Sequence, residues 1–182
     1  MDDKRSRFEA LVLPHLDAAY RLARWLSRAP GDADDIVQEA FLRAFRAFDT
    51  LRSQDARAWV LAIVRNCHLS ALQQGRRRAA EPLGEEHEAA PDAAAGSGGA
   101  SDPEGASIER DERRRLARLI AALPGEQREV LVLRELEDMS YREIAAVTAV
   151  PIGTVMSRLA RARAALRALW HEESAGDGRA VR

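Results

Sequence analysis

The chain has 182 residues, a formal net charge of −1 and one cysteine, Cys67, which excludes disulfide frameworks and multi-cysteine zinc sites. No apolar run is long enough to span a bilayer, and the polar start Met-Asp-Asp-Lys-Arg is no signal peptide, so we expect a cytoplasmic protein without a membrane contact of its own. The four histidines are scattered, and we expect no metal, no cofactor and no catalytic residue.

The charges are segregated along the chain. Residues 1–79 carry 14 Lys and Arg against 10 Asp and Glu, a net charge of +4. Residues 80–111 have a net charge of −8, and residues 112–182 a net charge of +3. Two mildly basic blocks therefore flank an acidic connector, a pattern that suits two nucleic-acid contacts on one chain.

The N-terminal block is predicted to form three helices. The first spans about residues 8–27, with Leu11 and Leu16 on its apolar side, and Pro14 either kinks it or marks its true first turn. The second follows Asp32, and its buried stripe consists of Val37, Ala40, Phe41, Ala44 and Phe48. The third spans about residues 56–74, and its core line consists of Val60, Val64, Cys67 and Ala71. Cys67 is thus expected to be a buried, small apolar residue.

The outer face of the second helix is a candidate partner surface. At spacings of three and four it collects Asp35, Gln38, Glu39, Leu42 and Arg46. A single exposed leucine among polar residues is common and needs no explanation. It can also anchor a partner helix, and the residues alone leave both interpretations open.

The third helix and its flanks hold candidate nucleic-acid contacts. The polar loop 49–55, which contains Arg52, leads into the helix, and Asn66 points away from the core line. After the helix comes a basic run, Arg76, Arg77 and Arg78. Such a run commonly only complements the helix dipole. Because this one closes a basic block just before an acidic segment, a phosphate contact is an equally good interpretation.

The connector, residues 80–107, is rich in Ala, Gly, Pro, Glu and Asp and nearly free of large apolar side chains. Such a segment buries too little apolar area to offset its ordering entropy, so we expect it to be disordered and flexible. As a random coil it would span on the order of 30 Å. The two basic blocks could therefore occupy separate DNA elements.

The C-terminal block contains a predicted helix-turn-helix. Ser140 and Glu143 have the spacing of a capping box, which predicts a helix from Tyr141. It should end near Thr148, because Pro151 pushes the residue before it out of the α region. A second helix then opens at Gly153 and Thr154, with Thr154 as a possible N-cap.

The second helix of this motif separates its faces. Its apolar side consists of Val155, Leu159, Ala162, Leu166 and Leu169. Ser157 and Arg161 lie on the opposite side, where a recognition helix meets base edges in a major groove. Arg158 borders the apolar stripe and is expected to hold a phosphate or an internal carboxylate. The plainer alternative is an amphipathic surface helix with solvated arginines.

Three segments, in this order, carry a family resemblance: residues 34–45, residues 58–66, and residues 123–158 with their Pro-Ile-Gly-Thr-Val-Met-Ser-Arg ending. They resemble the sigma-70 family of RNA polymerase sigma factors, in its compact extracytoplasmic-function (ECF, group IV) class. The resemblance implies an all-α fold with a sigma-2-like domain at residues 1–79, a linker at 80–107 and a sigma-4-like domain at 108–171. A polar tail at 172–182 would follow.

The resemblance also assigns roles to these residues. Core-polymerase binding on the clamp helices of the β′ subunit falls to Asp35, Gln38, Glu39 and Leu42. Recognition and melting of the −10 element fall to Arg52, Trp59, Asn66, Arg76, Arg77 and Arg78. Recognition of the −35 element falls to Thr154, Ser157, Arg158, Arg161 and Arg163. Of these, Ser157 and Arg161 would contact bases. This chain has Met156 and Ala160 where the family often has a basic residue and an aromatic one, respectively.

The implied partners are core RNA polymerase, through the β′ clamp helices and the β flap, promoter DNA, and an anti-sigma factor. Two other functions compete on the residues alone. An ordinary transcription regulator would explain the helix-turn-helix but leave residues 34–45 and the acidic connector without a purpose. A polymerase- or anti-sigma-binding adaptor would leave Arg161 and the arginine run unexplained.

Overall fold

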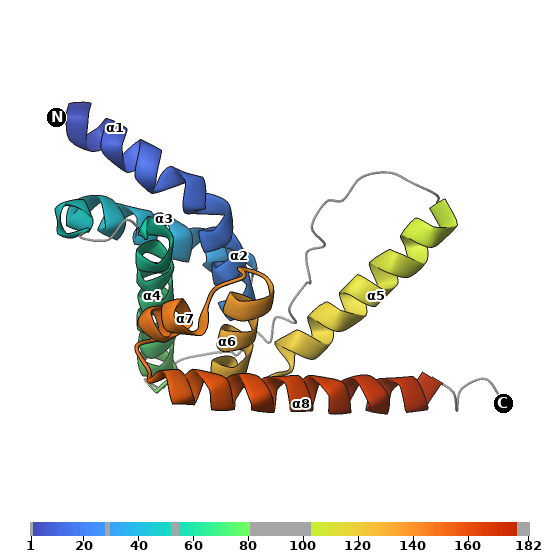
Figure 1. Cartoon of the computed structure of the whole chain (residues 1–182). Helices are drawn as coiled ribbons and strands as arrows, with labels where there is room; N and C mark the ends of the chain where they lie inside the picture. Colours follow the sequence, from blue (N-terminus) through green and yellow to red (C-terminus); the bar gives the residue numbers. More distant parts are fainter. Residues whose placement is uncertain (1, 28–29, 52–54, 81–102, 178–182) are drawn as a thin grey trace.

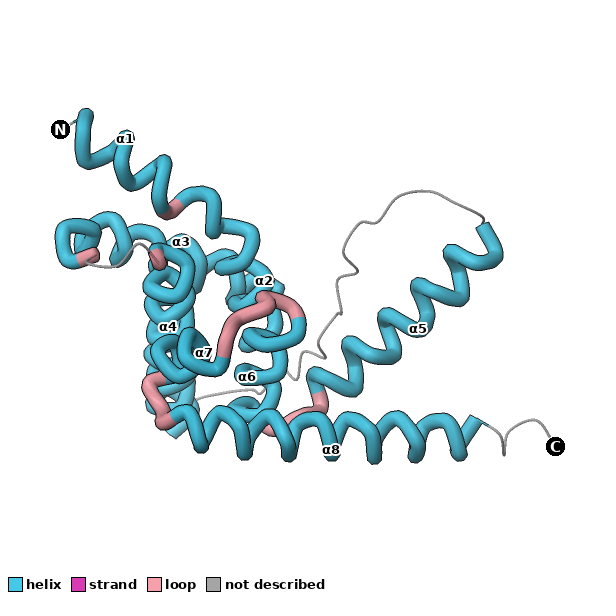
Figure 2. The backbone as a smooth tube through the Cα atoms, in the orientation of Figure 1, coloured by secondary structure: helices cyan, strands magenta, loops and turns pink. Residues whose placement is uncertain are grey.

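The computed structural model describes residues 2–27, 30–51, 55–80 and 103–177. These residues form eight α-helices and two short 3-10 helices, and they contain no strand (Figure 2). The all-α prediction is therefore confirmed for the described part of the chain. Arg52, most of the predicted linker and the last residues of the predicted tail lie outside it.

The first predicted helix is broken in two at Pro14. The structure has α1 at Asp2–Leu11, a 3-10 turn, η1, at Leu13–His15, and α2 at Leu16–Leu26. Proline cannot donate a helical hydrogen bond, and its ring clashes with the preceding turn, so the chain restarts its helix after it. The predicted apolar side is wrong at Leu11 and Leu16, which are both exposed because the break changes the direction of the helix.

Two helices complete an N-terminal unit, which we define as α1 to α4. Helix α3 spans Pro30–Ala47 and is followed by η2 at Phe48–Thr50, and α4 spans Ala56–Ala80. The stripe predicted for α3 is confirmed, with Val37, Ala40, Ala44 and Phe48 buried and Phe41 half-buried. Cys67 is buried as predicted, whereas Ala71 is exposed.

Helix α4 continues beyond its predicted end at residue 74 and includes the arginine run within its last turns. An exposed glycine costs a helix only about 1 kcal/mol, and arginine is a good helix former, so Gly75 does not end it. Arg76 and Arg77 are therefore fixed to a helix rather than to a following loop.

The C-terminal unit consists of α5 at Pro103–Ala121, α6 at Gly125–Glu135, α7 at Tyr141–Thr148 and α8 at Ile152–Asp177. Helix α5 begins inside the predicted linker, and α8 extends past Trp170 into the predicted polar tail. The Arg115 guanidinium explains this extension, because it lies 4.4 Å from the centre of the Trp170 ring and its Nε bonds Glu173 Oε2 at 2.9 Å. Helix α5 thus holds the far part of α8 in place.

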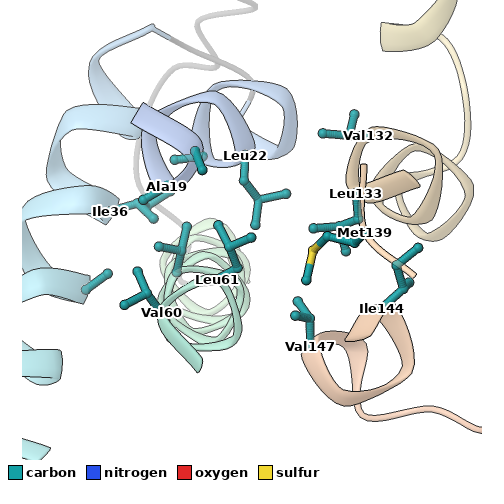
Figure 3. Close-up of a cluster of buried hydrophobic side chains, with 14 of the residues drawn as sticks. Ala19, Leu22, Ile36, Val60, Leu61, Val132, Leu133, Met139, Ile144 and Val147 are labelled. Atoms are coloured by element: carbon teal, nitrogen blue, oxygen red, sulfur yellow. The ribbon is translucent and has the colours of Figure 1, made fainter. Parts of the chain in front are cut away.

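The two units pack on each other and share one apolar core. Helix α6 lies beside α2, and α7 lies across α4, while α5 projects away from the bundle (Figure 1). Leu22 and Leu61 of the N-terminal unit face Leu133, Met139 and Val147 of the C-terminal unit (Figure 3). No local sequence pattern indicated this interface.

Among the described residues, no single helix is long and apolar enough to cross a membrane. In the same described part of the chain, α7 and α8 taken together reach that length and composition, and they are bent by 101°.

Candidate nucleic-acid and partner surfaces

The helix-turn-helix starts with the predicted capping box. Ser140 Oγ accepts a hydrogen bond from the Glu143 backbone N–H at 3.3 Å, and the Ser140 N–H donates to Glu143 Oε2 at 2.6 Å. Hydrogen bonding of Ser140 to the Glu143 carboxylate lowers the pKa of this carboxyl, since it favours the charged form. The predicted bounds of α7, Tyr141 to Thr148, are confirmed.

The turn between α7 and α8 is shorter than predicted, because α8 begins before Gly153. Ala149 adopts a left-handed conformation with φ of 53°, which ends α7. Helix α8 already begins at Ile152, and the Thr154 N–H donates to the Pro151 carbonyl at 2.9 Å. Thr154 therefore lies in the first turn of α8, and its predicted role as N-cap is wrong. Proline fixes a helical φ before the glycine, so the helix starts earlier.

Helix α8 has the predicted two faces. Val155, Leu159 and Ala162 are buried against the rest of the C-terminal unit. On the opposite side Arg161 is exposed, and its Nη2 lies 3.4 Å from Ser157 Oγ. The two residues assigned to base recognition therefore lie together near the N-terminal end of α8, the end that enters a major groove in this motif.

Two arginines of α8 are held within their own unit. Arg158 Nη2 lies 2.7 Å from Glu126 Oε2, and the Arg158 side chain is only 15% exposed. This is the internal carboxylate that the sequence offered as one alternative. Arg163 Nη2 lies 2.6 Å from Glu135 Oε1, on the surface. A phosphate contact by either residue stays a prediction, and it requires the ion pair to rearrange.

The candidate partner surface on α3 is exposed as the sequence predicted. Asp35 and Gln38 are exposed, and Leu42 is 48% exposed. Glu39 Oε1 accepts a hydrogen bond from Arg43 Nε at 2.6 Å, which fixes one side of this surface. We call Asp35, Gln38, Glu39 and Leu42 the α3 surface.

Helix α4 aligns several of the candidate nucleic-acid contacts. Trp59 is half-buried against the core, whereas Asn66 and Arg77 are exposed. At 3.6 residues per turn these three residues fall on one face of the helix, with Arg76 about a quarter turn away. The side chain of Arg78 and the whole of Arg52 lie outside the described part of the structure. The −10 and −35 candidates thus belong to separate helices, α4 and α8.

The structure brings together further charged residues at the interface between the two units. The side chain of Glu137, between α6 and α7, is 0% exposed and accepts hydrogen bonds from Arg21 of α2 and Arg57 of α4. Glu129 of α6 pairs with Arg65 of α4, with 2.6 Å between Oε1 and Nε. We call these five residues the interdomain ion pairs. No local pattern marks them, because the partners are more than sixty positions apart.

Three buried titratable groups have displaced pKa values. Burial raises the pKa of Glu129, although Arg65 opposes the shift. Burial, reinforced by the charge of Arg128 and opposed by that of Asp32, lowers the pKa of His68. Burial also raises the pKa of the Cys67 thiol. Within the described ranges, no cluster of three His, Cys, Asp or Glu side chains could hold a metal ion.

The displaced pKa of His68 predicts a pH dependence of stability. Because this pKa lies below the ordinary value of 6.5, the unfolded chain binds the proton first as pH falls, and stability is lost through pH 6.5 and below. We expect His68→Gln to flatten the dependence of the free energy of unfolding on pH between pH 7.5 and 5.5, by at most about 1.4 kcal/mol per pH unit. Urea unfolding measured across this range tests it, and an unchanged slope would contradict it. A residual slope from His15, whose pKa is also lowered by burial, should stay.

Comparisons with known proteins agree with these two units. The model of sigma-70 region 2 matches residues 11–78, and that of sigma-70 region 4 matches residues 113–166. The chain is 39% identical over 155 residues to the ECF RNA polymerase sigma-E factor of Escherichia coli K12, covering 81% of this chain and 79% of that protein. It is 35% identical over 162 residues to the ECF RNA polymerase sigma factor SigE of Mycolicibacterium smegmatis, covering 88% of this chain and 60% of that protein.

Solved structures show the same fold. The sigma factor RpoE, in a complex with the anti-sigma factor NepR from Bartonella quintana, matches with a TM-score of 0.74 and 25% identity, over 94% of this chain and 98% of that one. CnrH, in a complex with the cytosolic domain of CnrY, matches with a TM-score of 0.63 and 30% identity, over 92% of this chain and 90% of that one. The chain belongs to the sigma-70 family of RNA polymerase sigma factors, in its ECF group.

Proposed function

We propose that this chain binds core RNA polymerase and directs transcription initiation at promoters that carry −35 and −10 elements. Family membership supports this function as a transcription initiation factor. The observation that supports this function best is that the chain has two exposed surfaces, the recognition face of α8 and the α3 surface. The first lies in the range matched by sigma-70 region 4 and the second in the range matched by region 2. The chain spans 60% of the length of the mycobacterial relative and 79% of that of the E. coli one.

Polymerase binding is assigned to the α3 surface. Leu42 supplies an exposed apolar anchor, and Asp35 and Gln38 supply polar groups around it. An apolar anchor with a polar rim is the arrangement in which a few residues carry most of the energy of a protein interface. The β′ clamp helices are the proposed partner of this surface, and the β flap that of the C-terminal unit.

Recognition of the −10 element is assigned to the face of α4 that holds Trp59, Asn66 and Arg77, with Arg76, Arg78 and Arg52 in support. Extruding a base costs a few kcal/mol of unstacking, which stacking and pocket contacts can offset. The arginines would hold the phosphate backbone beside it. Nothing in this mechanism requires a catalytic group, and we propose that the protein is not an enzyme.

Recognition of the −35 element is assigned to Ser157 and Arg161, with Thr154, Arg158 and Arg163 as further candidates. An arginine that projects from a recognition helix can donate two hydrogen bonds to guanine in the major groove. Because Met156 and Ala160 flank these residues, their base preference is expected to be this chain's own.

Control by an anti-sigma factor is proposed from the structures that this chain resembles, in which RpoE is bound to NepR and CnrH to the cytosolic domain of CnrY. The proposed location is the cytoplasm, where core polymerase and promoter DNA are available.

Dependence on core polymerase tests this function against that of an ordinary regulator. Purified chain alone should bind promoter duplex weakly and without sequence preference, whereas the chain with core polymerase should form a salt-resistant promoter complex. A gel-shift titration with each component omitted measures both. Tight, sequence-specific binding of duplex by the chain alone would favour the regulator, and binding to core without promoter recognition would favour the adaptor.

A further inference from the structure

Two arginines of α8 flank the residues assigned to base recognition. At about 100° per residue, Arg158 lies about 100° around the helix from Ser157 on one side, and Arg163 lies about 120° from it on the other. A recognition helix in the major groove has a phosphate backbone on each side of its base-reading face. Arg158 and Arg163 are therefore placed for contacts with the two backbones, whereas Ser157 and Arg161 lie between them.

Each of these two arginines is bound by a carboxylate of α6, which packs on α8 (Figure 1). In the first turn of α6, Glu126 Oε2 lies 2.7 Å from Arg158 Nη2. At the last residue of α6, Glu135 Oε1 accepts hydrogen bonds from Arg163 Nη2 at 2.6 Å and from Arg163 Nε at 3.2 Å. The two cations that flank the base-reading face are thus already paired within their own unit.

Both ion pairs are open to solvent on at least one side. The Glu126 side chain is 72% exposed, and the side chains of Arg163 and Glu135 are 42% and 48% exposed. Exposed ion pairs contribute little to stability, so opening them costs little. They differ in this from the pairs of Glu137, whose side chain is 0% exposed. A phosphate can therefore replace the carboxylate on either arginine of α8.

We propose that Glu126 and Glu135 compete with DNA phosphates for Arg158 and Arg163, and that this competition sets the affinity of α8 for duplex DNA. In the free chain the carboxylates hold both arginines, and on DNA the phosphates replace them. Each exchange gains only the difference in free energy between two similar ion pairs. This is a physical reason for weak duplex binding by the chain alone. The proposal rests on the proposed function in placing α8 on DNA, whereas the competition can be measured without polymerase.

Fluorescence anisotropy of a short labelled duplex, titrated with the full chain, tests the competition. Low salt is used, because phosphate contacts weaken as salt increases. Glu126→Gln and Glu135→Gln should each raise the affinity about two- to fivefold, because the amide leaves the arginine to the phosphate. Since phosphates carry no sequence information, the gain should be equal for two duplexes of unrelated sequence. A gain confined to one sequence would overturn the assignment to the backbone.

The matched control is Asp138→Asn. The Asp138 side chain is 98% exposed, and its carboxylate lies 4.0 Å from Arg134 of α6 rather than beside an arginine of α8. Asparagine tolerates the left-handed φ of 47° at this position, so the fold should not change. The substitution removes one negative charge from the same unit, and the affinity should stay close to that of the parent. Equal gains for Asp138→Asn and Glu135→Gln would overturn the proposal, because net charge alone would then explain both.

A double-mutant cycle separates the competition from other effects of the carboxylate. Arg163→Gln should lower the affinity for duplex, and adding Glu135→Gln to it should bring no gain, because no arginine is left to compete for. An equal gain from Glu135→Gln with and without Arg163 would overturn the proposal. Because this ion pair lies on the surface, urea unfolding should show the same stability for all four chains of the cycle.

The full chain with both Glu126→Gln and Glu135→Gln gives the largest expected effect, a gain of about tenfold if the two sites are independent. Absence of duplex binding by this chain and by the parent would overturn the proposal. The absence of transcripts from core polymerase with every variant would instead reject the proposed function and leave the duplex result unaffected.

Discussion

Leu42→Asp is expected to abolish binding to core RNA polymerase while the protein stays folded. Leu42 is 48% exposed on α3, so aspartate there creates neither a cavity nor a buried charge. In the proposed complex, the same carboxylate would be desolvated without a partner at the centre of the contact. Losing an apolar anchor costs 2 kcal/mol or more at such hot spots, and the buried charge adds to this, so affinity should fall by about 100-fold or more. Surface-bound core polymerase and a concentration series of the variant measure it.

The control for this substitution is Leu11→Asp. Leu11 ends α1, is 46% exposed and lies outside the α3 surface, so it matches Leu42 in chemistry and exposure. It should bind core polymerase as the parent does. Unfolding of the Leu42 variant, or equal losses of affinity in both variants, would show that the α3 surface has been misassigned.

Arg161→Ala is expected to weaken transcription only from promoters that have an intact −35 element. The Arg161 side chain is exposed beside Ser157, so the substitution should leave stability unchanged. Loss of an arginine contact to a base costs about 1–3 kcal/mol, which corresponds to a roughly 5- to 150-fold loss of promoter binding. Transcription from paired templates, with the −35 element intact or scrambled, measures it.

Arg167→Ala provides the charge-matched control, since Arg167 is also exposed on α8 but lies further from its N-terminal end. It should lose much less on the intact promoter. If Arg161→Ala reduced transcription equally from both templates, its role in base recognition would be rejected, and a general electrostatic contribution would remain.

The sequence predicted those parts of the fold that depend on local patterns. The capping box of Ser140 and Glu143 and the proline at 151 delimit α7, and both signals act within a few residues. The buried apolar stripe on α3 and the two faces of α8 follow from helical periodicity. The exposure of Leu42 and Arg161 could therefore be predicted from the sequence alone.

The predictions were wrong or incomplete where tertiary contacts determine the ends of a helix or the partner of a charged side chain. Pro14 was predicted either to kink the first helix or to mark its true first turn, and in the structure it lies in η1, directly before α2. The end of α8 depends on Arg115 of α5, which lies 55 positions before Trp170. The interdomain ion pairs could not be predicted at all, because a glutamate in a turn, such as Glu137, normally faces solvent.

Transcription in vitro by purified core polymerase, with and without this chain, on a sheared library of host DNA tests the proposed initiation function most directly. We expect discrete new transcript starts that share two upstream elements and disappear with Leu42→Asp. A folded chain that binds core polymerase or DNA but produces no such starts would contradict it.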